Sequence, residues 1–548
     1  MSDPVSTIEL PSDYYLTNFW QLIDGVTQRY DDLLTPHEQQ LIATLCSLSL
    51  DAQLLYVRLL CRKGIYFRFD KLRYSEIGDM DAACIELKQA QLVEINAPLS
   101  WDAIGHICTV SELRTFGPFA KTLAKPQLLA ALAEQTPPAQ LSFDVLTLLE
   151  NDWLTLFSLL YFNNPHQNLT DFVLSDLKVR QYEQYRLDKQ TRLYQDRAQI
   201  EQALQLALLA DELEQQPKGG SWPIDPLLSQ LPEPLEHPAL QRRRRRILEK
   251  IAREYERREQ HPTALDLYTQ CDSAFSRERQ IRILAKTAPE QALQYLEQWQ
   301  THPLSLSEQQ FIAPFHYRLA RQLKRPIDPP ATVNYQRIDW SQPRMPQAPE
   351  QSALSVLREQ GWQGVHCENA LINGMLALTL WDILFMDQLP GVFFHPFQAG
   401  PADLYAHDFI HKRQPQADQA LESVLTPSWP TLIRQRYRQK QGLINPLFDW
   451  QAFPESLLEA ALTHVPAPIW RHLFDYQLSD LKLTRAGMPD LFVWNHNQYG
   501  WIEVKGPHDK LQKNQLIWLE QLQRLEQPVA VCFLGHNEQA QDSPLYFR

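Results

Sequence analysis

Glycine is scarce in this sequence, and its cysteines form no pattern. Only 17 of the 548 residues are glycine, about 3% against a usual share of ~7%. β-Barrels, propellers and large glycine-looped nucleotide-binding folds need many tight turns, so the shortage argues against all three and predicts no nucleotide cofactor. The seven cysteines are dispersed and include no C-x-x-C pair. They are typical of reduced thiols in a cytosolic protein, not of a zinc site or a disulfide framework.

Long hydrophobic runs and a targeting segment are also missing. The first ten residues, MSDPVSTIEL, have neither a basic start nor an apolar run, so we expect no secretory signal. The most membrane-like stretch, 369–381, has 13 uncharged residues and is short of the ~20 needed to span a bilayer. The formal charge of −13 provides no global attraction to nucleic acid, which would have to bind through local basic patches or metal ions. We expect a cytoplasmic protein with no membrane partner.

Proline is abundant, with 39 residues, and it is concentrated in two stretches, 216–238 and 325–349. Helices do not continue through such segments, so both predict domain boundaries. At roughly 150 residues per domain, the length predicts three or four domains. We place them at 1–105, 106–215, 239–325 and 350–548. The fold class expected is mainly α and multidomain, with a C-terminal α/β domain.

The first three domains have helical patterns. Apolar residues at three- and four-residue spacing predict helices over 14–30 and 35–62, and we expect the N-terminal third to be helical throughout. Residues 111–134 predict two short helices, the second beginning near Lys125, that resemble the DNA-backbone-holding SAP motif; a plain helical hairpin explains them equally well. Helices near 264–268 and 292–296 resemble tetratricopeptide (TPR) arrays, although the sequence has no clean 34-residue period.

The last domain has a mixed pattern. A helix is expected over 367–385, followed by a mixed insertion. Two β-rich runs, 490–494 and 499–504, are separated by polar turn residues and predict a hairpin. A helix over 509–525 and a buried strand over 529–534 complete the expected order.

The hairpin places three charged residues together. Because side chains alternate along a strand, Glu503 and Lys505 face one side while Val504 points into the core, and pairing of the strands brings Asp490 beside Glu503. Two carboxylates and the Val504 carbonyl are the oxygen ligands that Mg²⁺ prefers, and Lys505 could position or deprotonate a water. Gln515 could point toward the carboxylates from the following helix, with Trp518 beneath it. This is the PD-(D/E)-x-K pattern of phosphodiester-cleaving nucleases; the alternative is a surface hairpin with a Glu503–Lys505 ion pair.

Longer motifs extend the pattern to a family. Residues 487–491 (GMPDL), 502–507 (IEVKGP) and 509–519 resemble the VRR-NUC nuclease domain. Residues 361–369 and 380–387 are similar to the segment that precedes this domain in the Fanconi-associated nuclease. Similarity to the N-terminal region of that family occurs at 14–19, 54–59 and 71–78. The resemblance covers almost the whole chain, and its length suggests a bacterial form that lacks the ubiquitin-binding zinc finger of animal relatives.

The resemblance implies a metal site made of Glu368, Asp490, Glu503 and the Val504 carbonyl, with Lys505 as the catalytic lysine and one or two Mg²⁺ or Mn²⁺ ions. Asn369 departs from the pattern, because we expect the family to prefer glycine there. This departure should affect the start of a helix and not the ligand. From the residue pattern alone, Glu368 is an ordinary first-turn glutamate stabilised by the helix dipole.

Basic residues are candidates for DNA contact. The run Arg242–Arg246, which includes Arg244, could grip phosphates, or it could form a solvated, ion-paired helix. Arg277, Arg279 and Arg282 form a second cluster, and family analogy suggests that one of the two clusters holds a 5′-phosphate. A basic segment around Tyr437 could contact a strand. Basic residues interleaved with aromatics at 62–74 favour DNA contact. The full set of candidates is Arg62, Lys63, Arg68, Lys71, Arg73, Arg244, Arg277, Arg279 and Arg436.

These inferences predict a structure-specific DNA nuclease, with 5′-flap endonuclease and 5′-to-3′ exonuclease activity, in the repair of interstrand crosslinks. We expect a monomer that acts on branched or 5′-flap DNA in the nucleoid. The alternatives are a Holliday-junction-resolvase-type endonuclease and a non-catalytic scaffold for branched DNA. A rival metallohydrolase hypothesis rests on Asp403, His407 and His411, which a helix would stack on one face.

Overall fold

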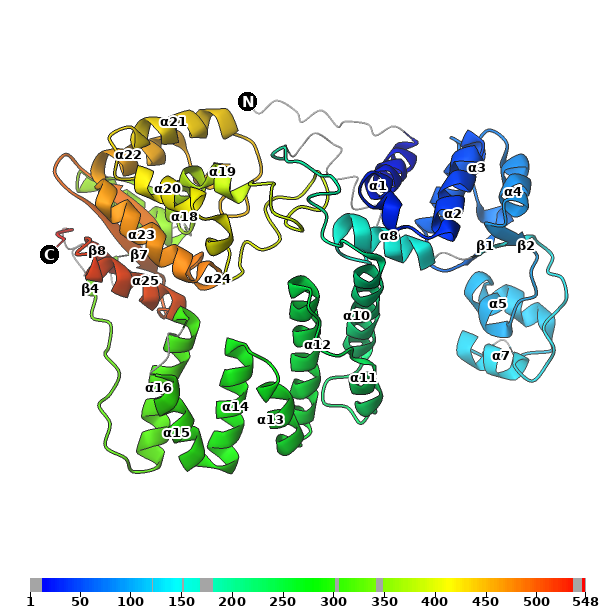
Figure 1. Cartoon of the computed structure of the whole chain (residues 1–548), viewed down its shortest axis with the longest axis horizontal. Helices are drawn as coiled ribbons and strands as arrows, with labels where there is room; N and C mark the ends of the chain where they lie inside the picture. The colour runs from blue at the N-terminus through cyan, green and yellow to red at the C-terminus, as the bar shows by residue number, and fades with distance from the viewer. Residues whose placement is uncertain are drawn as a thin grey trace. The chain divides into compact units, whose positions relative to one another are not determined.

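The computed structural model describes residues 12–120, 122–149, 152–167, 181–300, 305–341, 348–535 and 545–547. The chain forms two compact units, residues 1–180 with 187–204 and residues 181–186 with 205–548. Figure 1 shows the course of the chain and labels its elements. This division is coarser than the four expected domains, which it does not test.

The first unit begins with the helix expected over 14–30, whereas the helix expected over 35–62 is interrupted at Leu48 and Ser49, whose backbone is extended. α1 spans Tyr14–Tyr30, α2 Pro36–Ser47 and α3 Leu50–Leu60. At the start of α2, Thr35 and Glu38 form a capping box, in which Glu38 accepts from the Thr35 N–H at 2.8 Å. The next helices are α4 (Met80–Gln89), α5 (Trp101–Ile107), α6 (Val110–Leu113), α7 (Lys125–Leu132) and α8 (Asp152–Phe162).

The expectation of an N-terminal third that is helical throughout is wrong. β1 (Tyr66–Arg68), β2 (Val93–Ile95) and β3 (Val145–Leu148) form an antiparallel sheet in the order β1-β3-β2. Phe67 pairs with Leu146 and Val93 pairs with Leu148. Strands of three or four residues are too short to show the alternation by which a sequence reveals a strand.

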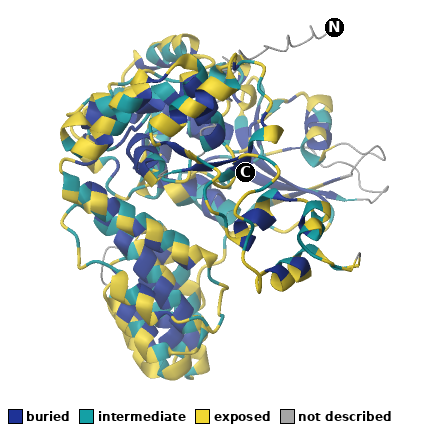
Figure 2. Cartoon of the chain, turned by 90° about the vertical axis from the view of Figure 1, so that its right-hand side faces the viewer, coloured by how far each residue is buried: buried dark blue, intermediate teal, exposed yellow. Residues whose placement is uncertain are grey.

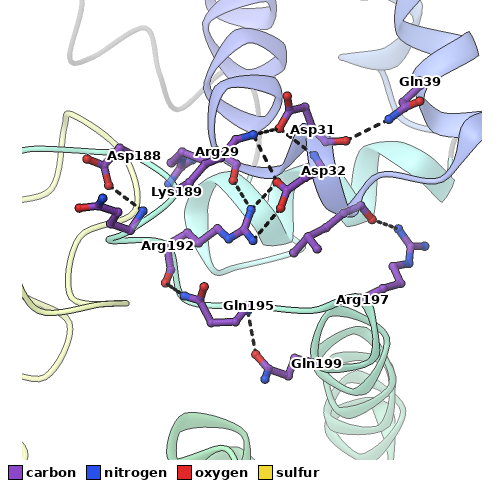
Figure 3. Close-up of polar contacts among 12 residues, drawn as sticks. Arg29, Asp31, Asp32, Gln39, Asp188, Lys189, Arg192, Gln195, Arg197 and Gln199 are labelled. Carbon is purple, nitrogen blue, oxygen red and sulfur yellow. Dashed lines mark hydrogen bonds and ion pairs between the residues drawn. The ribbon is translucent and has the colours of Figure 1, made fainter.

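Arginines fasten residues 187–204 to α1 and α2 within the first unit (Figure 3). The Arg192 side chain is only 6% exposed and donates to both carboxylate oxygens of Asp32, at 2.5 and 2.9 Å, and to the Arg29 carbonyl. Arg197 binds both oxygens of Glu38 at 2.8 and 3.0 Å, so one glutamate both caps α2 and holds this segment. Arg192 lowers the pKa of Asp32 to about 2 through these hydrogen bonds.

The second unit contains a row of helices followed by a mixed sheet. α10 (Arg197–Gln215) ends in this unit, and α11 (Asp225–Gln230) lies within the first proline-rich stretch. Successive helices then pack on one another: α12 (Pro238–Arg257), α13 (His261–Thr269), α14 (Ala274–Thr287), α15 (Pro289–Trp299) and α16 (Leu306–Gln322). Burial follows their inner faces, as the dark blue stripes in Figure 2 show.

Five strands form the C-terminal sheet in the order β4-β8-β7-β6-β5. They are β4 (Gln336–Ser341), β5 (Gln363–His366), β6 (Leu491–Trp494), β7 (Tyr499–Lys505) and β8 (Val529–Gly535). β6 is antiparallel to β5 and β7, whereas β8 is parallel to β4 and β7. The expected hairpin and last strand are confirmed. β4 lies before residue 350, where the sequence suggested a boundary, yet it forms an edge of this sheet.

Helices cover the sheet and fill the insertion between β5 and β6. α17 (Pro349–Glu359) packs on a core that includes Leu354, Val493 and Val504. The insertion contains α18 (Ala370–Thr379), α19 (Trp381–Leu384), α20 (Gln416–Ser423), α21 (Trp429–Lys440), α22 (Glu455–His464), α23 (Ala467–Ser479) and α24 (Leu481–Thr484). α25 (Lys513–Arg524) joins β7 to β8. None of the described helices is long and apolar enough to cross a membrane.

Two helices are shorter than expected. The helix expected over 367–385 begins only at Ala370 and breaks at Leu380, where φ is −101° and ψ is 19°. The helix expected from residue 509 begins at Lys513. Asp509 instead closes a turn by accepting from the Gly506 N–H at 3.0 Å, and Gln512 occupies the N-cap position of the helix. In both cases a polar turn occupies residues that the apolar spacing had assigned to a helix.

We expect Arg192→Ala to destabilise the packing of residues 187–204 on α1 by about 2 kcal/mol, because charge-assisted hydrogen bonds to a buried guanidinium are lost. Hydrogen exchange of α1 peptides in the full chain should show about 30-fold less protection. The contribution should be present above pH 4 and lost as pH falls toward 2, because folding lowers the pKa of Asp32. Lys88→Ala, at an exposed site on α4, is the control. Equal exchange in the two variants would contradict this assignment.

Candidate active site

The turn before β6 places Asp490 at the end of the strand. Gly487 has φ of +89°, and a Cβ on it would lie 2.7 Å from the backbone carbon of Asn514 at the start of α25. Only glycine combines this conformation with so close an approach. Met488 follows and is buried. The glycine of the GMPDL motif therefore allows the turn to pack against α25 before Asp490 enters the sheet.

Asp490 connects three strands through hydrogen bonds. Its carboxylate accepts from the Val504 N–H on β7 at 2.7 Å. Its carbonyl accepts from the N–H groups of Cys367 at 2.8 Å and Glu368 at 2.9 Å, just beyond β5. The pairing of Leu491 with Ile502 sets the register that brings Asp490 next to Glu503. The predicted juxtaposition of these two carboxylates is observed.

Glu503 and Lys505 form a buried ion pair. Glu503 Oε1 lies 2.7 Å from Lys505 Nζ, and the two side chains are 1% and 8% exposed. Val504 between them belongs to the core under α17, as the alternation of side chains predicted. A surface hairpin with an exposed ion pair, the simpler alternative, is therefore wrong.

Burial and neighbouring carboxylates raise the pKa values of both carboxyl groups. For Glu503, desolvation is the main cause, the charge of Asp490 adds to it and Lys505 opposes it, which leaves a pKa of about 8. Desolvation also raises the pKa of Asp490; the Val504 N–H and Lys505 oppose the shift, and the charges of Glu350 and Glu368 reinforce it. Two neighbouring carboxylates that resist ionisation are typical of a functional site.

The donors suit a hard divalent cation, although the carboxylates do not form a closed cage. Among the described residues, no group of three or more His, Cys, Asp or Glu side chains is arranged to hold a metal ion. Glu503 Oε1 is nevertheless buried, and its recorded partner among the described residues is Lys505 Nζ at 2.7 Å. A divalent ion would stabilise this oxygen and the adjacent carboxylate of Asp490. The ligand set Glu368, Asp490, Glu503 and Val504 remains a prediction.

Glu368 has an unusual backbone conformation and lies outside the helix. Its φ of +33° is rare for a residue with a side chain. α18 begins at Ala370 with Asn369 as its N-cap, so Glu368 is not the first-turn glutamate that the residue pattern alone suggested. It lines a pocket of about 260 Å³ together with His366, Phe448 and Asp449.

Asn369 touches the predicted ligand, contrary to expectation. Its Nδ2 donates to Glu368 Oε1 at 3.1 Å, and its Oδ1 accepts from the Met488 N–H at 3.2 Å. The departure from glycine was expected to affect only the start of a helix. A single sequence shows no such contact, because Met488 is more than a hundred residues away.

Gln515 caps α25. Its Oε1 accepts from the Gln512 N–H at 2.8 Å, so the amide oxygen satisfies a backbone donor at the N-terminus of the helix. Trp518 is buried as expected, and its indole N–H donates to the Thr484 carbonyl at 2.9 Å. A catalytic role for Gln515 remains a prediction.

Seven of the nine candidate DNA-binding residues make polar contacts within the protein, including Arg62 with the Tyr74 hydroxyl at 2.8 Å and Arg73 with the Leu72 carbonyl at 2.9 Å. Arg68 is buried between Asp70 and Glu112, and Arg244 donates to the Pro232 carbonyl at 2.5 Å. Arg277 pairs with Glu308, Arg279 with Glu256, and Arg436 with backbone carbonyls and Asp382. Arg62, Lys63, Lys71 and Arg73 are exposed. Contact with DNA remains a prediction for all nine.

Sequence reasoning missed a basic hollow between α14 and α16. A pocket of about 700 Å³ is lined by Arg279, Arg282, Lys286, Arg318 and Phe315. Arg282 lies over the rings of Phe311 and Phe315, and Arg318 lies over Phe315. The signal in the sequence was the spacing of Phe311 and Phe315, four residues apart, with Arg318 one turn further along.

The rival transition-metal hypothesis is not supported. Residues 403–411 form turns, followed by a short 3₁₀ helix at His411–Arg413, so no α-helix stacks Asp403, His407 and His411. The carboxylate of Asp403 is bound by the fully buried Arg413 at 2.8 and 2.9 Å. That ion pair already uses both of its oxygens.

The mixed sheet with Asp490, Glu503 and Lys505 at adjacent strand ends defines a nuclease domain of the VRR-NUC class, and the model of the VRR-NUC domain matches residues 428–533. The model of the FAN1 HTH domain matches residues 13–94. The Fanconi-associated nuclease 1 homolog of Pseudomonas aeruginosa is 34% identical over 552 residues, which cover 97% of each chain. The chain therefore belongs to the Fanconi-associated nuclease 1 family, and its match to a bacterial member extends over nearly the full length, as the motifs predicted.

A further relative and two solved structures are also similar to this chain. Fanconi-associated nuclease 1 of Ailuropoda melanoleuca is 23% identical over 96% of this chain and 63% of that protein. The crystal structure of paFAN1 bound to 2-nt 5′-flap DNA with a gap has a TM-score of 0.84 and 33% identity, and covers 96% of this chain and 99% of that one. The corresponding complex with a 1-nt flap has a TM-score of 0.82.

We expect the metal-free protein to become less stable between pH 5 and pH 8, and Glu503→Gln to flatten this dependence. The folded state raises the pKa of Glu503 from 4.5 to about 8, so it binds a proton that the unfolded chain has released, and stability falls as pH rises through this window. The thermal unfolding midpoint of the wild type should fall as pH rises through this window. The fall should be a few degrees smaller for Glu503→Gln. Glu359→Gln, at an exposed site on α17, is the control and should follow the wild-type curve. Parallel curves for Glu503→Gln and wild type would contradict the raised pKa.

Proposed function

We propose that this chain is a structure-specific DNA nuclease that hydrolyses phosphodiester bonds with Mg²⁺ or Mn²⁺, as a 5′-flap endonuclease and a 5′-to-3′ exonuclease. Its proposed role is interstrand crosslink repair in the bacterial cytoplasm, at the nucleoid. The observation that carries the proposal is the convergence of Asp490, Glu503 and Lys505 on paired strands. Its support is the similarity in fold to a protein crystallised with 5′-flap DNA.

The acidic residues would hold one or two divalent ions. Asp490 is the proposed central ligand, because its short side chain is fixed by the Val504 N–H at the end of a paired strand. Glu503 and the Val504 carbonyl would complete one side, and Glu368 would approach from beyond β5. When bound, the ions supply Lewis-acid polarisation of the scissile phosphate and activate the attacking water.

Lys505 would position the attacking water. Its ammonium has three donors, and Glu503 holds it at 2.7 Å. The remaining donors can orient a water or a phosphate oxygen at the same edge of the sheet. Because both side chains are buried, their interactions act in a low dielectric and gain strength.

The helical parts are proposed to bind the branched duplex. Arg62, Lys63, Lys71 and Arg73 are exposed and interleaved with aromatic residues, which suits contact with phosphates and bases. In the second unit, the basic hollow between α14 and α16 offers arginines and stacked rings. In this function α6 and α7 would act as a SAP-like pair of helices, and α12 to α16 would act as a TPR-like helical layer. With few basic residues carrying the phosphate contacts of an acidic chain, binding should weaken steeply with salt.

We expect Asp490→Ala to lower cleavage of a labelled 5′-flap duplex in Mn²⁺ by at least about a thousandfold, because the central ligand is lost. Binding of the same DNA should remain within roughly threefold of wild type. Lys505→Ala should reduce the rate of the chemical step more than the affinity for Mn²⁺. Single-turnover cleavage and fluorescence anisotropy, with and without Mn²⁺, provide these quantities.

Each alternative has its own outcome in this assay. Loss of DNA binding together with cleavage in Asp490→Ala would contradict its role as a ligand. Preference for four-way junctions over flaps would favour a junction resolvase. Binding without Mn²⁺ and without turnover of any flap substrate would favour a scaffold.

A further inference from the structure

Asn369 bridges the two sides of the acidic site. Its amide nitrogen donates to the carboxylate of Glu368 at 3.1 Å. Its amide oxygen accepts from the Met488 N–H at 3.2 Å, two residues before Asp490. One side chain therefore holds both the carboxylate beyond β5 and the turn that leads into β6. Neither aspartate nor glycine can make both contacts, because an ionised carboxylate only accepts and glycine has no side chain.

A second layer of amides fixes Asn369. Asn373, one turn along α18 and 2% exposed, donates to the Asn369 carbonyl at 2.7 Å and to the Arg485 carbonyl at 2.9 Å. Its own oxygen accepts from Gln477 on α23, which is fully buried. Buried polar groups that satisfy one another in this way are rigid, because each broken contact leaves an unpaired group in the core. These hydrogen bonds form a continuous chain from Gln477 on α23 through Asn373 and Asn369 to Glu368.

The backbone of Glu368 needs such support. A φ of +33° is unfavourable for a glutamate and persists only where the surroundings fix it. The main chain is held by the hydrogen bond from the Glu368 N–H to the Asp490 carbonyl. For the carboxylate, the Asn369 amide is the only hydrogen-bond donor recorded among the described residues.

We propose that Asn369 is a positioning residue, which orients the Glu368 carboxylate toward the divalent-cation site and couples it to the Asp490 turn, and that Asn373 and Gln477 hold it in place. This inference rests on the proposed function. Asn369 contacts neither DNA nor metal in this account and acts through Glu368. Partners that orient a ligand typically contribute ten- to a hundredfold to metal affinity.

Two substitutions separate the contacts. Asn369→Asp keeps the acceptor for the Met488 N–H but removes the donor to Glu368 and places a carboxylate beside it. Asn369→Ala removes both contacts without adding charge. The matched control is Asn497→Asp, which makes the same change at an exposed position in the β6–β7 turn.

Mn²⁺ binding to the full chain without DNA, measured by titration calorimetry, provides a readout independent of cleavage. We expect Asn369→Asp and Asn369→Ala to bind Mn²⁺ roughly ten- to a hundredfold more weakly than wild type, and Asn497→Asp to bind it equally well. Thermal unfolding without metal verifies that each variant is folded. If Asn369→Asp does not fold, Asn369→Ala carries the test.

A double-mutant cycle distinguishes positioning from general structural support. If Asn369 acts through Glu368, Asn369→Ala should change Mn²⁺ affinity by less than about twofold in a Glu368→Gln background. An undiminished effect in that background, or wild-type affinity in Asn369→Ala, would overturn this inference while leaving the nuclease proposal intact. Failure of the unaltered chain to bind Mn²⁺, together with full cleavage by Asp490→Ala, would instead overturn the proposed function.

Discussion

The burial of two neighbouring carboxyl groups, Asp490 and Glu503, is the constraint on which the candidate site depends. Burial opposes ionisation of both, the charge of Asp490 adds to the effect at Glu503, and the charges of Glu350 and Glu368 add to it at Asp490, so the pKa values of both are raised. Lys505 offsets only part of this cost from within the same strand. A divalent cation would stabilise both ionised carboxylates at once. The arrangement is therefore suited to binding such an ion. Burial of the two carboxyl groups costs folding stability, as is common at functional sites.

The sheet creates this constraint through register and turn geometry. Pairing of β6 with β7 fixes Asp490 beside Glu503, and Gly487 lets the preceding turn pass close to α25. The Asp490 carbonyl holds the backbone beyond β5, which brings Glu368 to the same edge. Three strands thus deliver the acidic residues, while α17 covers the opposite face with an apolar core. A shift of one residue in the β6–β7 register would send Glu503 into that core.

The sequence predicts the hairpin and its charged residues because alternation along a strand is local information. It also predicts α1, whose apolar spacing is likewise local information. It fails for β1 to β3, which are too short for a periodic pattern. It also fails to show that Arg68 and Arg279 are paired within the protein, because their acidic partners come from other elements. Glu368 was predicted as a metal ligand only from the family resemblance, because neither its positive φ nor its contact with Asn369 can be deduced from residue spacing.

The most direct test is diffraction from crystals of the unaltered chain soaked in Mn²⁺, with anomalous scattering used to locate the metal. The account predicts a peak bounded by the carboxylates of Asp490 and Glu503 and the carbonyl of Val504, with Glu368 turned toward it. Mn²⁺ found only elsewhere on the protein, in crystals of a preparation that cleaves DNA with Mn²⁺, would contradict the central claim.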